Sequence, residues 1–277
     1  MGIIALPPGQ FQFDELGEIG AGGLGRVDKI RITASNTAAK PVGTFWARKR
    51  LNTKWGANPI MIERLEREIA ALKSMFHPNI VTCEGENLPG GERFYLMPLF
   101  SDSVRKHIAR GGFRNDCRAI AQQGIILAGA MQYAHSQGII HRDLKPDNLL
   151  FNPNGPLTIT DWGIGYFIHK ESKVLVQLTR GGMGTEYYCS LEQWASGKCD
   201  HRGDIYSLGM TLDEWVRGSQ RSIRVGAGIG GPSVTADGDG ARRLNALLQQ
   251  MTQPFAKARP VSMSVVATEL REALAGR

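Results

Sequence analysis

The chain contains 277 residues and carries a formal net charge of +7 at neutral pH. This length predicts one or two domains with a buried core, and a composition of 42% hydrophobic and 21% charged residues excludes wholesale disorder. No apolar run approaches the roughly 18 residues that a membrane-spanning helix needs, so no membrane association is expected. The cysteines form no C-x-x-C pair, which disfavours a zinc site or a disulfide framework and predicts a cytoplasmic location; they are Cys83, Cys117, Cys189 and Cys199.

The isoelectric point of about 9.4 raises the question of a nucleic-acid partner. The basic residues occur in small separate groups, without the interleaved aromatic residues of a single-strand binding surface. A solvated surface, or attraction to phosphate-bearing and acidic ligands, accounts for them equally well. Nucleic acid is therefore the disfavoured partner; the groups are Arg48–Arg50, Arg105–Lys106, Arg217 with Arg221 and Arg224, and Arg242–Arg243.

The first part of the chain predicts strands followed by one helix. Residues 13–50 have strand character with glycine punctuation, and Phe94–Met97 form a short apolar strand. From Pro59 to the residues before Pro78, apolar side chains recur at spacings of three and four, which predicts an amphipathic helix. Its apolar positions are Met61, Leu65, Ile69, Leu72 and Phe76.

The second part is mainly helical. A long helix is predicted with Ile120, Leu127, Met131 and Ala134 on its apolar face and Gly138 at its end. Short strands flank residues 141–163, and the chain from 204 onward predicts further helices. A glycine-rich stretch from Gly226 to Gly240 predicts a mobile surface loop. A strand-rich first part and a helix-rich second part indicate an α+β protein in two lobes.

A glycine motif occurs early, as Gly20-x-Gly22-x-x-Gly25 followed by Val27. Glycines allow backbone N–H groups to approach phosphates that a Cβ atom would obstruct. Alone the motif is weak, and a plain turn is an equal alternative. A dinucleotide-binding fold requires a helix directly after the motif. Here a strand follows instead, which favours a glycine flap over ATP.

The most informative stretch is His141-Arg142-Asp143-Leu144-Lys145-Pro146-Asp147-Asn148. It places a potential base, a cation and an amide in one short loop between apolar segments. Asp161-Trp162-Gly163 follows after another short strand, which brings a second carboxylate near Asn148. A carboxylate and an amide oxygen suit Mg²⁺, with nucleotide phosphates completing its coordination. Asp143 is then placed to orient a hydroxyl and accept its proton.

Taken together, these motifs resemble those of the eukaryotic-type (Hanks-type) serine/threonine protein kinases, in order over nearly all of the chain. Ala47-Arg48-Lys49 is similar to the family's lysine motif, and Glu68 to the glutamate that pairs with that lysine. His77-Pro78-Asn79 fixes the register of the helix that carries this glutamate. Trp162 stands where the family usually has phenylalanine.

Later landmarks of the family are also present. Gly184–Glu192 aligns without gaps on the segment that docks a polypeptide, although Leu191 replaces a proline. The resemblance implies that Glu192 pairs with Arg259, and that Asp204 caps the backbone of the catalytic loop.

The resemblance implies a bilobal protein-kinase-like fold of the α+β class, with a small antiparallel β-sheet and one αC helix in the N-lobe and a mainly helical C-lobe. It implies a single kinase domain over residues 1–277, with the N-lobe at 11–96, the hinge at 97–100, the C-lobe at 101–277 and an activation segment at 161–192.

The resemblance also assigns roles to single residues. Lys49, held by Glu68, contacts the α- and β-phosphates of ATP, and Asp143 is the base. Lys145 neutralises the transferring phosphoryl group, and the Thr185 hydroxyl bridges Asp143 and Lys145. Asn148 and Asp161 hold Mg²⁺. The remaining nucleotide-binding positions are Ile19, Gly20, Gly22, Gly25, Val27, Ala47, Met97 as gatekeeper, Leu99 in the hinge, and Leu150.

The function implied is transfer of the ATP γ-phosphoryl group to serine or threonine hydroxyls of proteins. Arg142 before the catalytic aspartate implies activation-loop phosphorylation, for which position favours Thr179 and then Ser172. Such autophosphorylation in trans allows for a transient homodimer. Two alternatives stay open: a pseudokinase or scaffold that binds ATP without transfer, and a kinase-folded enzyme that phosphorylates a small molecule or nucleic acid.

Overall fold

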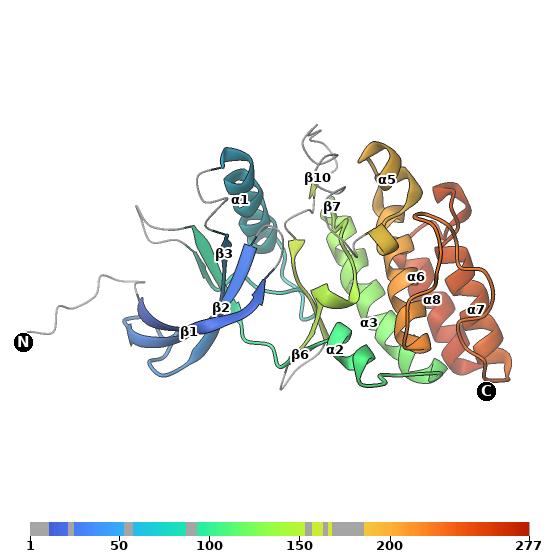
Figure 1. The fold of residues 1–277 in the computed structure, drawn as a ribbon, viewed down its shortest axis with the longest axis horizontal. Coiled ribbons are helices and arrows are strands. Elements are labelled where there is room, and N and C mark those ends of the chain that lie inside the picture. The colour runs from blue at the N-terminus through green and yellow to red at the C-terminus, as the bar shows by residue number, and fades with distance from the viewer. Residues whose placement is uncertain are drawn as a thin grey trace, which may run out of the picture. The chain divides into compact units, whose positions relative to one another are not determined.

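The computed structural model describes residues 11–21, 25–52, 58–86, 93–152, 157–162, 166–167 and 186–276. The chain divides into two compact units (Figure 1). The first unit comprises Met1–Ser74 and Val81–Phe100, and the second comprises Met75–Ile80 and Ser101–Arg277. The helix-ending stretch 75–80 therefore groups with the second unit.

The first unit contains an antiparallel sheet and the helix α1, in the described residues. The sheet has the strand order β1-β2-β3-β5-β4. Its strands are β1 (Phe11–Ala21), β2 (Gly25–Ser35), β3 (Phe45–Leu51), β4 (Gly85–Glu86) and β5 (Phe94–Pro98), and α1 spans Pro59–Ser74. Met61, Leu65 and Leu72 of α1 are buried, as their spacing predicts. Phe76 is 88% exposed because α1 has already ended at Ser74.

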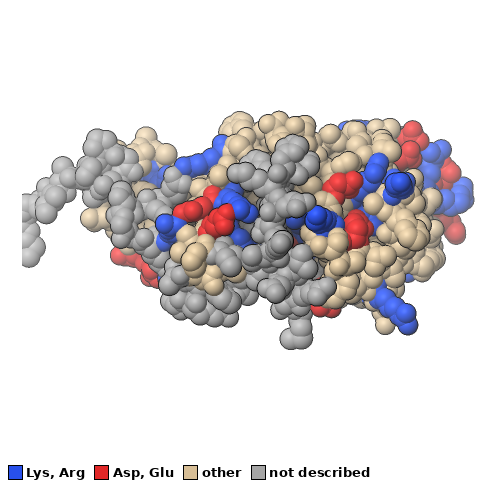
Figure 2. Space-filling view, turned by 90° about the horizontal axis from the view of Figure 1, so that it is seen from above, with Lys and Arg blue, Asp and Glu red and all other residues tan. Residues whose placement is uncertain are grey.

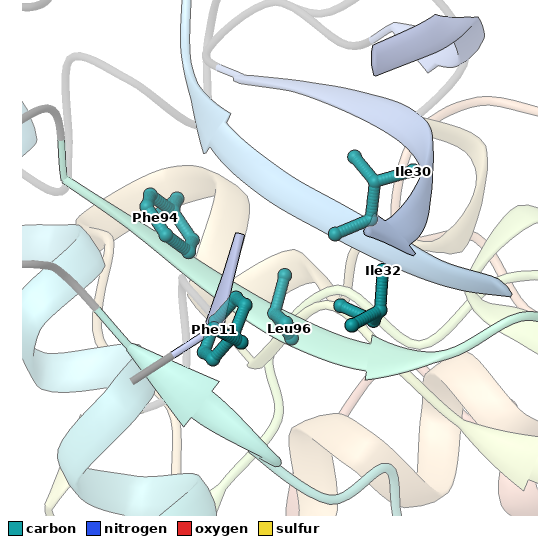
Figure 3. Packing of buried hydrophobic residues seen from close by; sticks show 5 residues of the cluster. All are labelled: Phe11, Ile30, Ile32, Phe94 and Leu96. Atoms are coloured by element: carbon teal, nitrogen blue, oxygen red, sulfur yellow. The ribbon is translucent and has the colours of Figure 1, made fainter. Parts of the chain in front are cut away.

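One face of this sheet holds a hydrophobic cluster. Figure 3 shows Phe11, Ile30, Ile32, Phe94 and Leu96 converging from β1, β2 and β5. Since side chains alternate along a strand, the residues between these positions lie on the opposite face. Val27 of β2 and Lys49 of β3 are register partners, and their side chains lie on this opposite face, away from the hydrophobic cluster.

A buried charge cluster lies on the same strands. Asp28 is fully buried and accepts hydrogen bonds from Arg26 at 2.6 Å, Arg50 at 2.7 Å and Arg48 at 3.0 Å. The guanidinium of Arg48 also lies over the ring of Phe13, 5.1 Å from its centroid. Burial by itself raises the pKa of Asp28, but the three guanidinium groups outweigh it and hold the pKa below its usual value.

The second unit is built around helix α6. Every residue of α6 from Gly203 to Val216 is buried, and α3, α7 and α8 pack together with it (Figure 1). The helices of the described residues are α2 (Val104–Ala109), α3 (Cys117–Ser136), α5 (Leu191–Ser196), α6 (His201–Arg217), α7 (Asp239–Met251) and α8 (Met263–Ala275), with the 3₁₀ turns η2 (Pro146–Asn148), η4 (Glu186–Tyr188) and η5 (Ala256–Ala258). Gly138, with a φ of 73°, follows the end of α3 as predicted.

Short strands complete this unit. The strands β6 (Asp102–Ser103), β8 (Leu149–Phe151) and β9 (Leu157–Ile159) form one small sheet, and β7 (Ile139–Ile140) pairs with β10 (Tyr166–Phe167). The α+β class and its division into a sheet-bearing and a helical unit are thus confirmed. In the part of the chain that the structure describes, no helix is both long and apolar enough to cross a membrane.

The loop predicted from Gly226 to Gly240 lies in the connection from α6 to α7, and the structure corrects its end. Its last two residues, Asp239 and Gly240, already belong to α7. Arg221 forms hydrogen bonds with the buried Asp213 and with the carbonyl groups of Gly230 and Pro232. Val234 is 1% exposed. The connection is anchored because a buried carboxylate fixes the arginine that gathers its carbonyl groups.

The Asp28 cluster predicts unequal effects of two aspartate substitutions. Asp28→Ala leaves three arginines without their shared buried acceptor and is expected to lower the free energy of unfolding by about 3 kcal/mol. Asp14→Ala is the control, because Asp14 pairs with Arg31 while both are half-exposed, and should cost about 0–1 kcal/mol. Urea unfolding measures both; equal losses would contradict the role given to Asp28.

Candidate active site

In the first unit, the structure brings Lys49 and Glu68 together. Lys49 Nζ lies 2.7 Å from Glu68 Oε1, and the two side chains are 15% and 3% exposed. Glu68 lies on the inward face of α1, in register with Leu65 and Leu72, and Lys49 lies on β3. A buried carboxylate is stable only when paired, so this ion pair fixes the rotation of α1 relative to the sheet.

Tyr95 joins this pair and was not singled out from the sequence. It is fully buried on β5, where its Cα is the register partner of Lys49, and its hydroxyl donates to Glu68 Oε1 at 2.9 Å. The available signal was a tyrosine two residues before Met97 in an otherwise apolar strand. Because buried tyrosine hydroxyl groups usually find a hydrogen-bond partner, this residue indicates a polar group nearby.

The other nucleotide-binding positions predicted in this unit lie along the sheet. Ala47 and Met97 are buried register partners on β3 and β5. Val27 faces Lys49 across the β2–β3 pair. At Gly25 a Cβ atom would lie 2.9 Å from the carbonyl oxygen of Arg50, so only glycine fits. Ile19 is half-exposed, Gly20 and Leu99 are partly buried, and Gly22 lies outside the described residues.

In the second unit, Asp143 lies in the loop between β7 and η2. Its Oδ2 atom accepts hydrogen bonds from Lys145 Nζ at 2.8 Å and from Asn148 Nδ2 at 3.2 Å. Its Oδ1 atom is buried and has no hydrogen-bond partner among the described residues. One oxygen of the carboxylate is therefore fixed by the loop, while the other remains as an acceptor.

The environment of Asp143 makes it a stronger base than an ordinary aspartate. Burial raises the pKa of Asp143, Lys145 lowers it, and the nearby Asp161 carboxylate raises it again, with a net upward shift. Because a base with a higher pKa accepts a proton more readily, the shift suits proton removal from a substrate hydroxyl.

The catalytic loop is held from two sides. Asp204, fully buried in the first turn of α6, accepts the backbone N–H groups of His141 at 2.9 Å and Arg142 at 2.8 Å. Gln193 of α5, 2% exposed, donates to the carbonyl oxygen of Arg142 at 2.7 Å. Arg142 itself has a φ of 68°, a strained conformation for a residue with a side chain. These hydrogen bonds hold that strained residue directly before Asp143.

Asn148 and Asp161 fit the predicted magnesium site. The amide N–H₂ group of Asn148 donates to the Asp143 carbonyl oxygen at 2.7 Å, which leaves the amide oxygen for a cation. Thr160, directly before Asp161, donates its N–H to the Asn148 carbonyl at 2.8 Å, so the two predicted ligands are tied together. Asp161 has a φ of 62°. Few protein oxygens are needed, because Mg²⁺ bound with a nucleotide takes its other ligands from phosphates and water.

The end of the predicted activation segment is docked onto this unit. Arg259, 2% exposed, forms a two-point ion pair with Glu192 at 2.7 and 2.9 Å. Burial raises the pKa of Glu192, but the hydrogen bonds from Arg259 outweigh it and leave the pKa below normal.

Of the remaining predicted site residues in this unit, Leu150 is partly buried on β8. Thr185, Gly184, Thr179 and Ser172 lie outside the described residues.

A second cluster of polar and charged side chains lies near the loop from His141 to Asn148, and it was not predicted from the sequence. Arg105 of α2 forms ion pairs with Asp147 at 3.1 Å and with the buried Glu214 of α6. The hydroxyl of Tyr188 donates to Glu214 and accepts from Arg105. These contacts link the loop from His141 to Asn148 to the η4 turn, which lies near the end of the predicted activation segment. No local motif marks them, since the partners are far apart along the chain.

Comparison with known proteins agrees with this geometry. The model of the protein kinase domain matches residues 13–223. A probable serine/threonine-protein kinase of Clostridium perfringens, CPE1738, is 30% identical over 200 residues, covering 72% of this chain and 28% of that protein. Serine/threonine-protein kinase PknA of Mycobacterium tuberculosis is 31% identical over 221 residues, covering 76% and 48%. CBL-interacting protein kinase 24 of Oryza sativa is 33% identical over 201 residues, covering 68% and 43%.

The chain belongs to the protein kinase family, in its Hanks-type serine/threonine branch. It spans between about a quarter and a half of the length of these relatives. The predicted family, and with it the type of fold, is confirmed.

The hydrogen bond from Gln193 predicts a defect in turnover. Gln193→Met keeps the side-chain volume but removes the bond to the Arg142 carbonyl, worth about 1–3 kcal/mol when buried. We expect a kcat reduced about tenfold with little change in KM for MgATP. Gln132→Met is the control, since Gln132 accepts a hydrogen bond from Ser264 on the outer helices. Steady-state kinetics measures kcat for both variants. Equal kcat values for Gln193→Met and Gln132→Met would contradict the role of Gln193.

Proposed function

We propose that this chain transfers the γ-phosphoryl group of ATP, with Mg²⁺, to serine or threonine hydroxyls of protein substrates. The observation that carries this proposal is the Asp143 carboxylate, with one oxygen fixed by Lys145 and Asn148 and the other buried without a partner among the described residues. Such a group is poised to accept one hydrogen bond, and a substrate hydroxyl supplies it. The kinase family of the chain supports ATP as donor.

The residues would act as follows. Asp143 Oδ1 accepts the proton of the hydroxyl, a contribution of roughly 10²–10⁴-fold for a general base. Lys145 shields the negative charge of the transferring group, and Lys49, fixed by Glu68, contacts the α- and β-phosphates. Asn148 and Asp161 hold Mg²⁺, which would neutralise charge on the phosphates. The backbone around Gly20, Gly22 and Gly25 covers them, and Ile19, Val27, Ala47, Met97, Leu99 and Leu150 surround the adenine.

The proposal extends to the regulation of the enzyme and to the location and class of its substrates. A single kinase domain would use Thr185 to bridge Asp143 and Lys145, and autophosphorylation at Thr179 or Ser172 within a transient homodimer would give Arg142 an anionic partner. Cytoplasmic proteins with serine or threonine acceptors are the proposed substrates. The surface supports a protein over nucleic acid: on the face in Figure 2, Lys and Arg lie beside Asp and Glu rather than in one basic patch.

Phosphoryl transfer is tested by incubating the purified chain with MgATP and mapping phosphosites by mass spectrometry. The parent chain is expected to gain phosphate on itself or on a generic protein substrate, whereas Asp143→Asn should lose at least about 10²-fold in rate. The control is Asp116→Asn, because asparagine also caps a helix well at the start of α3.

Each alternative has its own outcome in this experiment. MgATP binding without any transfer would establish a pseudokinase or scaffold. Transfer to a metabolite or RNA but never to protein would establish a kinase-folded enzyme that phosphorylates a small molecule or nucleic acid. Asp143→Asn turning over as fast as the parent would remove Asp143 from the mechanism.

Lys145 sets the pH dependence of the base. Because its ammonium lowers the pKa of Asp143 against the effect of burial, Lys145→Met should raise that pKa. Asp143 would then stay protonated to a higher pH, and the acidic limb of the kcat/KM profile should move upward in pH. The exposed Lys257 provides the control variant Lys257→Met, whose profile should match the parent. A limb that stays in place in Lys145→Met would contradict the coupling.

A further inference from the structure

The Lys49–Glu68 ion pair has a third member, the hydroxyl group of Tyr95. Both donors reach the same oxygen: Lys49 Nζ lies 2.7 Å and the Tyr95 hydroxyl 2.9 Å from Glu68 Oε1. The Lys49 ammonium also lies 5.8 Å from the centroid of the Tyr95 ring, within reach of a cation–π contact. The three residues come from three different elements: β3, α1 and β5.

The strand register explains why these groups meet. Lys49 and Tyr95 are Cα partners in the antiparallel β3–β5 pair, so their side chains emerge side by side on the same face of the sheet. Ala47 and Met97, two residues away on each strand, share that face. Glu68 reaches it from α1. The tyrosine ring thus fills the space between the sheet and α1, with its hydroxyl directed at the carboxylate.

The burial of Tyr95 and Glu68 makes the hydrogen bond between them strong. Tyr95 is 0% and Glu68 3% exposed. A carboxylate in such surroundings is costly unless several donors satisfy it, and hydrogen bonds to a charged acceptor are the stronger class. With Tyr95 present, Glu68 keeps one buried donor even when Lys49 shares its ammonium with another anion.

We propose that Tyr95 is a positioning residue for the phosphoryl-transfer reaction: its hydroxyl holds Glu68 in place, and Glu68 in turn orients Lys49 toward the nucleotide phosphates. This rests on the proposed function, because it assigns Lys49 to phosphate binding. The hydroxyl of Tyr95 acts through Glu68, whereas the contact of its ring with Lys49 does not involve the hydroxyl.

Tyr95→Phe tests the proposal because it removes the hydroxyl and keeps the ring. Calorimetric titration of the whole chain with MgATP and, separately, with adenosine divides phosphate binding from adenine binding. We expect MgATP to bind about tenfold more weakly to Tyr95→Phe, with adenosine affinity unchanged within about twofold. A role in packing alone would weaken both ligands together or neither, and either result would overturn the proposal.

A double-mutant cycle identifies the route of the effect. In a Glu68→Leu background, which offers no acceptor oxygen to the hydroxyl, Tyr95→Phe should cause no further loss of MgATP affinity. Repetition of the full loss in that background would overturn the proposal. The matched control is Tyr206→Phe, which also deletes a buried tyrosine hydroxyl, one that donates to the Ala227 carbonyl at 2.9 Å in the second unit; its ratio of MgATP to adenosine affinity should equal that of the parent.

The outcomes separate this inference from the function on which it rests. A parent chain that binds MgATP no better than adenosine would overturn both. A parent that prefers MgATP together with an unaffected Tyr95→Phe would overturn the inference alone. The expected binding pattern without phosphoryl transfer by the parent would support the orientation of Lys49 toward the nucleotide phosphates by Tyr95 and Glu68, and would overturn the proposed function alone.

Discussion

The conformation of the loop from His141 to Asn148 depends on one buried carboxylate, that of Asp204. It lies on the most buried helix of its unit and accepts backbone hydrogen bonds from two consecutive residues, His141 and Arg142. His135 contacts the same carboxylate at 2.8 Å. Burial raises the pKa of Asp204, but the hydrogen bonds with His135 and with the Arg142 backbone outweigh it and hold the pKa below its usual value. Two parallel N–H groups on one anion hold Arg142 in its left-handed conformation, and the direction of Asp143 follows from that turn.

The sequence was most informative where partners lie close together along the chain. The spacing of Asp143, Lys145 and Asn148 predicted their grouping, and the helical period from Met61 to Leu72 predicted the buried face of α1. Lys49 and Glu68 required the family resemblance, because 19 residues separate them. Arg105 and Glu214, which are 109 residues apart, could not be paired from a single sequence. Tyr95 was hidden for another reason: in a buried strand a tyrosine satisfies the apolar pattern, and nothing local shows where its hydroxyl points.

The basic composition looks different once the side chains are placed. Two of the three residues in the Arg48–Arg50 group point to Asp28, and the third pairs with Glu68. Arg221 is directed to Asp213, and Arg243 to Asp239 and Glu272. Several arginines that the structure describes therefore have acidic residues as direct neighbours. Such pairing lowers the positive potential close to these arginines.

The anchored connection between α6 and α7 has a consequence for how this unit opens. The Arg221 guanidinium donates hydrogen bonds to the carbonyl groups of Gly230 and Pro232 and to the carboxylate of Asp213. The backbone N–H of Arg221 donates to the Tyr187 hydroxyl. Because one guanidinium holds so many acceptors, the connection cannot loosen gradually from its tip. Its release exposes Val234 and Ile229 and frees Tyr187 in the same event. We therefore expect residues 218–238 to open as one cooperative unit, with amide protons that exchange together with those of the η4 turn.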